Sequence, residues 1–291
     1  MTYPIVNVTT SDGLLFHGLL TEPEHPMETI IIHTHGTSGS FYWNSFYKSL
    51  TESAISLGLS YLATNNRGSS IYELEEGFVP HGAALEHFED CLLDIDVWIE
   101  FALSRGYKKV ILEGHSFGTE KVVYYATKGK YKSVVTAIIL LGFSDSFATQ
   151  TRYPEKAQKE YMYEAQQLLR DGKPYQLLTD LRAQAGSTLP VSAATYVNFF
   201  IPGSELSNTL PLRNGKKLLL LRDIQIPILG VIGDQNDEYT HIPIRDAMAL
   251  IESENKQAET HQINNSNHGF EGKETELAAV IADFLKRRVL H

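Results

Sequence analysis

The stretch VILEGHSFGTEKVVYY, residues 110–125, decides how the rest of the sequence is interpreted. Its apolar start is typical of a strand, and the segment after Ser116 has the pattern of a helix that ends at Gly129. Gly114 and Gly118 flank the serine where a sharp strand-to-helix turn leaves no room for side chains. The pattern therefore predicts that Ser116 stands exposed at a sheet edge, where the free N–H groups of a helix attract an anion.

Strand patterns alternate with helical patterns along most of the chain. Eight short runs rich in apolar and β-branched residues occur, at residues 4–10, 14–20, 29–36, 59–68, 108–114, 133–142, 226–234 and 257–265. Between residues 85 and 104 apolar residues recur every three or four positions, which predicts an amphipathic helix. We therefore expect an α/β protein with a mostly parallel central sheet of about eight strands, flanked by helices and antiparallel at its start.

One long segment, residues 147–222, interrupts this alternation. Its pattern is helical or irregular, rich in tyrosine, glutamine and lysine, and it is too long for a loop without structure. We expect a helical cap inserted after the sixth strand, over the strand ends where open α/β sheets bind ligands, and a core of residues 1–146 and 223–291. A surface excursion without a functional role is the alternative. If the cap encloses a pocket, its aromatic residues are candidates for substrate binding, Tyr161 and Tyr163 among them.

A serine hydroxyl needs a base beside it to act as a nucleophile. Of the eleven histidines, His268 lies in the loop between the last predicted strand and the terminal helical segment, which completes the chain order serine, acid, histidine. Its neutral imidazole is able to accept the proton of Ser116 and return it to a leaving group, because histidine titrates near neutral pH. The sequence therefore predicts Ser116 and His268 as catalytic, with an ordinary loop histidine as the alternative.

Three aspartates at strand ends are candidates for the acid that orients the imidazole. Asp234 and Asp237 follow the run ILGVIG, and Asp145 follows the run AIILLGFS. The loop GDQNDEY, residues 233–239, lies beside the strand that leads to the histidine, and within it we predict Asp237 as the acid. Asp234 is more typical of a residue that caps a turn. Both Asp234 and Asp145 stay open as alternatives.

The composition limits the kinds of partner. The chain carries 35 acidic and 25 basic residues, a formal charge of −10, which disfavours nucleic acid and fits a small neutral or cationic substrate better. The start lacks the features of a signal sequence and no run of 18 apolar residues occurs, so we expect a cytoplasmic protein without membrane insertion. The single cysteine, Cys91, is expected to be a buried structural thiol. A homodimer stays open.

No cofactor and no metal are expected. The glycine-rich HGTSGS, residues 35–40, has neither the GK[ST] ending of a phosphate loop nor the spacing of a dinucleotide site. His33 and His35 have the spacing of metal ligands, but no third ligand follows closely. We interpret His35 as a residue that stabilises its loop, and His115 as a packing or orienting neighbour of the serine.

Taken together, these motifs resemble those of the α/β-hydrolase fold family, and the resemblance covers nearly the whole chain. HTHGTSGS, residues 33–40, is similar to the oxyanion loop of that family, which implies that the backbone N–H groups of Thr37 and Phe117 hold an oxyanion. The cap is at the position of the family's lid. More narrowly, four segments are similar to the branch that contains siderophore ester hydrolases of the fusarinine type: GHSFGTEKVVYY, FEDCLLDIDVWI, NNRG and DEY.

Three functional hypotheses follow. The first is a serine hydrolase that cleaves a small or medium ester through an acyl-enzyme. The second is a C–C bond hydrolase, a thioesterase or an acyltransferase that uses the same residues, because the fold does not decide among these reactions. The third is a ligand-binding module without catalysis. The ordered set of serine, acid and histidine favours an enzyme, since binding alone needs no such set.

Overall fold

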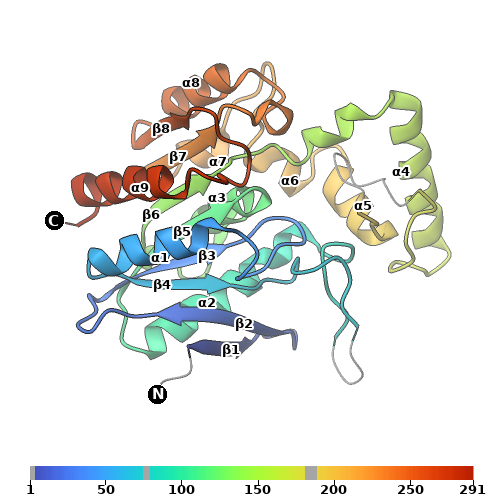
Figure 1. Ribbon diagram of the computed structural model, residues 1–291. Coiled ribbons are helices and arrows are strands. Elements are labelled where there is room, and N and C mark those ends of the chain that lie inside the picture. The colour runs from blue at the N-terminus through green and yellow to red at the C-terminus, as the bar shows by residue number, and fades with distance from the viewer. Residues whose placement is uncertain (1–3, 75–78, 181–188, 291) are drawn as a thin grey trace.

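A computed structural model of the chain describes residues 4–74, 79–180 and 189–290, except for the side chains of residues 150 and 237. Its eight strands form one sheet in the order β1-β2-β4-β3-β5-β6-β7-β8 (Figure 1). β1 pairs antiparallel with β2, and β2 with β4, while all later pairs are parallel. The strands are β1 Ile5–Thr9, β2 Leu15–Thr21, β3 Thr29–Thr34, β4 Ser60–Thr64, β5 Lys109–His115, β6 Val135–Leu141, β7 Ile228–Gly233 and β8 Ala258–Ile263. All eight predicted strands and the antiparallel start are confirmed.

Helices cover both faces of the sheet. They are α1 Phe46–Ser56, α2 Cys91–Ser104, α3 Phe117–Lys128, α4 Glu155–Arg170, α5 Ala193–Phe200, α6 Glu205–Thr209, α7 Leu219–Arg222, α8 Ile244–Glu254 and α9 Glu274–Arg288. Four short 3₁₀ segments complete the described elements: η1 Phe88–Asp90, η2 Lys132–Val134, η3 Ala148–Arg152 and η4 Asp237–Tyr239. The helix predicted over residues 85–104 is shorter than expected, because η1 precedes α2 and the regular helix begins only at Cys91.

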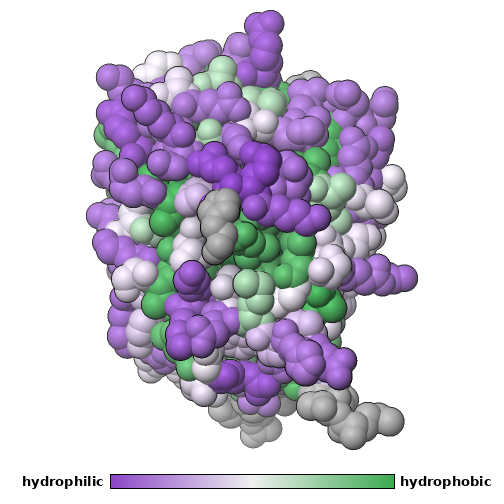
Figure 2. All heavy atoms as spheres, turned by 90° about the vertical axis from the view of Figure 1, so that its left-hand side faces the viewer, coloured by the Kyte–Doolittle hydropathy of each residue, from purple (hydrophilic) through white to green (hydrophobic). Residues whose placement is uncertain are grey.

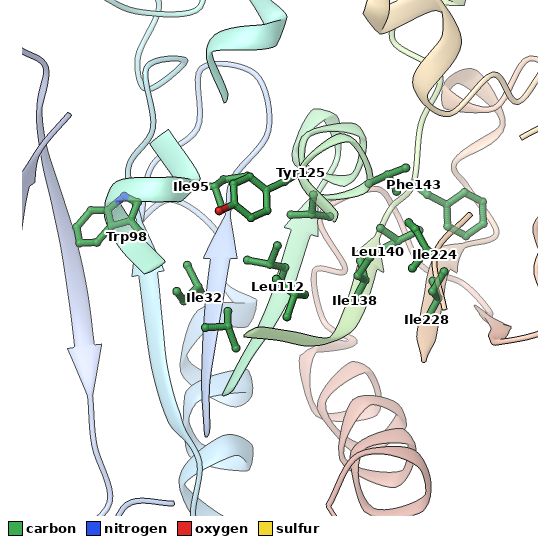
Figure 3. Close-up of a cluster of buried hydrophobic side chains, with 14 of the residues drawn as sticks. Ile32, Ile95, Trp98, Leu112, Tyr125, Ile138, Leu140, Phe143, Ile224 and Ile228 are labelled. Carbon is green, nitrogen blue, oxygen red and sulfur yellow. The ribbon is translucent and has the colours of Figure 1, made fainter. Parts of the chain in front are cut away.

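Alternate residues of the central strands fill two separate cores. Ile32, Leu112 and Ile138 project from the sheet toward the side chains of α2 and α3, which Figure 3 shows with Trp98 and Tyr125 among them. The intervening strand residues pack instead against α1 and α9. Burial on both faces explains why these strands read as continuous apolar runs in the sequence.

The segment between β6 and β7 is divided between two environments. α5 and part of α4 form a small apolar cluster together with Phe117 and Tyr124 of α3. The last part of the segment packs instead into the core between the sheet and helices α2 and α3, called the main core below. It does so through Leu210, Leu212, Leu218 and Leu221. A helical insertion after the sixth strand is thus present, whereas its treatment as a separate domain over residues 147–222 stays a prediction.

Both chain ends lie on the side of the molecule that is away from α4 and α5. Figure 2 shows that side, where hydrophilic residues surround a smaller area of hydrophobic ones. Among the described residues, no helix is both long and apolar enough to cross a membrane.

The turn between β5 and α3 depends on two glycines. A Cβ atom on Gly114 would lie 2.3 Å from the carbonyl oxygen of Gly118, and one on Gly118 would lie 2.2 Å from the carbonyl oxygen of Thr34. Real Cβ atoms do not approach backbone so closely, so the tight turn between β5 and α3 requires glycine at position 114, and α3 is able to pass this close to β3 only because Gly118 has no side chain.

We therefore predict that Gly118→Ala lowers the free energy of unfolding by about 1 to 3 kcal/mol, the usual cost of overpacking. Urea titration followed by circular dichroism measures this. Gly269→Ala is the matched control, because a Cβ there would meet no atom closer than 3.8 Å. Equal losses in the two variants would contradict the assigned role of the close approach.

Candidate active site

Ser116 occupies the sharp turn that the sequence predicts. Its backbone angles, φ 57° and ψ −126°, are rare for a residue with a side chain. The backbone N–H of Ser116 donates to the carbonyl of Leu141 at 2.9 Å, and the carbonyl of Ser116 accepts bonds from the N–H and hydroxyl of Thr119 at 2.9 and 2.6 Å. These bonds from β6 and α3 hold the strained conformation and turn the serine side chain into the pocket described below.

The loop after β8, which carries His268, is fixed by two residues from elsewhere in the sheet. The Asp234 carboxylate accepts the backbone N–H groups of Asn265 and Ser266 at 2.9 and 3.0 Å, which lowers its pKa. His115 lies with its Nε2 2.9 Å from the carbonyl oxygen of His268. Asp234 thus holds the loop that carries His268 and does not contact the imidazole through a hydrogen bond among the described residues.

Of the two nitrogens of the His268 imidazole, one has a hydrogen-bond partner among the described residues and the other has none. Nδ1 lies 2.6 Å from Oδ1 of Asn236, so it donates its proton to the amide oxygen. The ring of Tyr239 is stacked on the imidazole at 3.7 Å, with an angle of 3° between the planes. Nε2 is buried and has no hydrogen-bond partner among the described residues. This tautomer leaves the lone pair of Nε2 available in the pocket that Ser116 also lines.

The contact between Asn236 and His268 is a finding that the sequence analysis missed. We predicted Asp237, the next residue, as the partner of the imidazole; its side chain lies outside the described part of the structure, so that assignment stays a prediction. Asn236 is fully buried. Its one signal in the sequence is its place in the GDQNDEY loop, because an amide is a less usual partner for such an imidazole than a carboxylate.

Asp145, the remaining alternative for the acid, has other partners. Its carboxylate pairs with Arg213 at 3.1 Å and accepts the backbone N–H of Ala148 at 3.0 Å. Burial raises the pKa of Asp145 to about 6, against the opposing effect of Arg213. These contacts fix the start of η3 after β6.

The loop after β3 lies against the serine. A Cβ on Gly36 would be 2.7 Å from that of Ser116, so the loop backbone passes directly beside this serine. The ring of His35 holds this loop, with Nδ1 2.7 Å from the carbonyl oxygen of Gly36 and Nε2 2.8 Å from the hydroxyl of Ser69. Burial lowers the pKa of His35 to about 3, which keeps this ring neutral at physiological pH.

A buried polar chain ties this loop to α3. Asn66 donates from Nδ2 to the carbonyl of His35 at 3.2 Å and accepts from Nζ of Lys121 at 3.2 Å. Lys121 also forms a buried ion pair with Glu86. The loop after β3, the NNRG segment after β4 and the helix after Ser116 are thus one connected unit.

The backbone positions predicted for an oxyanion hole are near the serine. Thr37 and Phe117 both line the pocket with Ser116. Because Phe117 is the first residue of α3, its N–H has no partner within the helix.

The pocket has a volume of about 670 Å³ and opens between the sheet edge and the insertion. From the insertion, Phe199 and Phe200 of α5 contribute to its described lining, and Tyr42 and Trp43 are largely exposed at its wall. Other lining residues are Ser38, Ser40, Ser70, Ile71, Ser144, Ser146, Thr149 and Arg152.

Tyr161 and Tyr163, our candidates for substrate binding, do not belong to this described lining. Tyr161 donates from its hydroxyl to Asp180 at 2.5 Å and packs against Tyr153 and Tyr196, while the Tyr163 side chain is 64% exposed on the outer side of α4. Sequence alone did not distinguish pocket aromatics from aromatics that pack helices together, so a substrate role for these two tyrosines stays a prediction.

Two other residues singled out by the sequence lie in cores. The ring of His33 faces Glu113, with Nδ1 2.6 Å from Oε1, and both side chains are buried. Cys91 is buried, and burial raises the pKa of its thiol well above the usual range. That environment suits the predicted structural thiol rather than a reactive one.

Comparison with known proteins agrees with this architecture. A family described as "Protein of unknown function (DUF1749)" matches residues 93–212, which include Ser116. The sequence matches none of the curated proteins with which it was compared.

Several solved structures are similar to nearly the whole chain. Est1E from Butyrivibrio proteoclasticus, with ferulic acid bound, has a TM-score of 0.69 at 14% identity, over 98% of this chain and 99% of that one. The carboxylesterase CesB from Bacillus subtilis has a TM-score of 0.61 at 15% identity, over 99% and 93%. XC6422 from Xanthomonas campestris, a serine hydrolase without a lid, has a TM-score of 0.57 at 13% identity, over 97% and 93%. The protein therefore has the α/β-hydrolase fold.

The environment of His268 predicts how it titrates. Burial, and after it the neighbouring His115, hold the pKa of His268 well below the ordinary value of 6.5. We expect Asn236→Asp to raise that pKa, because a carboxylate beside Nδ1 stabilises the imidazolium. NMR titration of the imidazole proton signals measures both values. Asn264→Asp adds the same charge at an exposed site of the same loop and should leave the His268 pKa nearly unchanged. An equal shift in both variants would contradict the local interaction.

Proposed function

We propose that this protein is a serine hydrolase that cleaves a carboxylic ester through an acyl-enzyme. The observation that carries the proposal is that two groups line one pocket: Ser116, held in a strained turn at the end of β5, and His268, whose buried Nε2 has no hydrogen-bond partner among the described residues. A ligand site formed only for binding needs neither the strain nor the unpaired base. The likeness to carboxylesterase CesB supports the same reaction class.

In the proposed reaction, Nε2 of His268 takes the hydroxyl proton while Oγ of Ser116 bonds to the ester carbonyl carbon. The carbonyl oxygen becomes an oxyanion, stabilised by the backbone N–H groups of Phe117 and Thr37. Collapse of this intermediate breaks the bond to the alcohol oxygen, which leaves with the proton from Nε2. Water then repeats both steps on the acyl-enzyme, releases the acid and restores Ser116.

Asn236 is proposed to keep the imidazole in the productive tautomer. Its amide oxygen accepts only from a protonated Nδ1, which places the lone pair on Nε2, where the base is needed. An amide carries no charge, so it orients the imidazolium without the electrostatic stabilisation of a carboxylate. Whether Asp237 adds that charge is the sequence-based hypothesis that the second experiment below tests. A siderophore ester as the natural substrate stays a prediction.

The first test is Ser116→Ala. We expect a loss of several orders of magnitude in kcat on p-nitrophenyl esters, as for removal of a triad nucleophile, with little change in Tm. A fluorophosphonate probe should label the wild type and not the variant. A screen that adds thioesters and hydroxamate esters separates ester cleavage from the alternative reactions. Turnover above a tenth of the wild-type value in the variant would rule out the mechanism.

The second test compares the two candidates for the residue that orients His268. Asn236→Leu, which keeps the branching at Cγ but has two methyl groups in place of the amide acceptor and donor, should lower kcat by about 10² to 10⁴ because the imidazole loses its orientation. Asp237→Asn, measured in parallel with the same ester, is the matched variant. A loss of about 10³ to 10⁴ in Asp237→Asn, with an active Asn236→Leu, would contradict the role of Asn236 and establish Asp237 as the acid.

A further inference from the structure

Arg152, the last residue of η3, is a charged side chain in an otherwise uncharged pocket wall. Apart from histidines, the described lining contains no other side chain that is charged at neutral pH: the remaining residues are glycines, hydroxyl and amide residues, aliphatic residues and aromatics. The Arg152 side chain is 25% exposed, so most of it is already removed from bulk solvent. A guanidinium in such a wall strongly prefers a negative partner, because no carboxylate of the described lining neutralises it.

The guanidinium of Arg152 has only a weak ionic partner among the described residues. Among the described residues its ionic contact is with Glu238, at 3.8 Å, and the Glu238 side chain is 64% exposed. Contacts of this length and exposure contribute little. Within the described part of the chain, none of its five N–H donors takes part in a hydrogen bond, whereas Arg213 forms an ion pair with Asp145 at 3.1 Å. The fork of Arg152 is therefore available to a ligand.

The position of Arg152 relative to His268 indicates which part of an ester it meets. Both residues lie beside the ring of Tyr239: the imidazole stacks on it at 3.7 Å, and the guanidinium carbon of Arg152 lies 5.8 Å from the centre of the same ring. Arg152 is thus near the Tyr239 and His268 part of the pocket lining. Because His268 delivers its proton to the departing alcohol, the alcohol part of an ester leaves on that side of the site.

We propose that the pocket accepts esters whose alcohol part carries a carboxylate, and that Arg152 binds this carboxylate. The proposal rests on the function proposed above. One guanidinium matches one negative charge, and its planar fork matches the two oxygens of a carboxylate. The formal charge of −10 does not oppose this, because surface charges more than about 8 Å away are screened at physiological salt, while Arg152 acts at contact distance.

The test uses two butanoyl esters that differ in one group, 4-(butanoyloxy)benzoate and its neutral amide, 4-(butanoyloxy)benzamide. We expect Arg152→Gln to lower kcat/KM for the carboxylate ester by about 10- to 100-fold, the range for a charge-assisted hydrogen bond, and to change the amide far less. The quantity compared is the ratio of kcat/KM for the carboxylate ester to kcat/KM for the amide, called the substrate ratio. Comparing this ratio between wild type and variant cancels the intrinsic reactivities of the two esters. Arg152→Lys, which keeps the charge and loses the fork, should retain part of the preference.

Two controls separate recognition from damage to the site. Arg245→Gln removes the same charge from a side chain that is 91% exposed, and it should leave the substrate ratio at the wild-type value. The rate at which a small fluorophosphonate labels Ser116 reports on Ser116 and His268 without the carboxylate contact, and it should change little in Arg152→Gln.

The outcomes are distinct. An unchanged substrate ratio in Arg152→Gln, with the amide still hydrolysed, overturns the role of Arg152 while the proposed function stands. A charge preference that appears only when the carboxylate is on the acyl part, tested with mono-p-nitrophenyl glutarate against p-nitrophenyl pentanoate, also overturns the proposal. Absence of hydrolysis and of Ser116 labelling in the wild type contradicts the proposed function itself.

Discussion

The close approach of two backbones, at Gly118 and Thr34, is the constraint on which the rest of the site depends. It brings the first turn of α3 against the end of β3, which places the loop that follows β3 beside Ser116. The same approach explains the buried chain from Lys121 through Asn66 to His35, because polar groups enclosed by tight packing need partners within the protein. Close packing and hydrogen bonds between buried polar groups thus hold the same three segments together: the loop after β3, the segment after β4 and the start of α3.

The fold was largely predictable because its signals are local. Strands buried on both faces give continuous apolar runs, and two glycines around a serine between a strand and a helix require a close backbone contact. The turn at Ser116 and the eight strands follow from such patterns. Asp234 was predicted to cap its own turn after Gly233, whereas its carboxylate holds the distant loop that carries His268, a contact that no local pattern indicates.

The lining of the pocket was not predictable in the same way, because it depends on contacts between segments distant in the chain. Asn236 meets His268 across 32 residues, and an asparagine in a loop has no pattern that distinguishes it from its neighbours. Tyr161 and Arg152 illustrate the same limit: the tyrosine packs within the insertion, while the arginine, which belongs to no sequence motif, lines the pocket. Tertiary position, rather than residue type, determines these roles.

The return of the insertion into the main core has a consequence for domain exchange. Four leucines near the end of the insertion pack in the main core together with α8: Leu210, Leu212, Leu218 and Leu221. They are therefore part of the hydrophobic core that supports the sheet, although they precede β7 in the chain. A chimera that exchanges this insertion for that of another protein with the α/β-hydrolase fold therefore needs its second junction before Leu210. A junction placed at Arg222 would remove these leucines and leave cavities in the core.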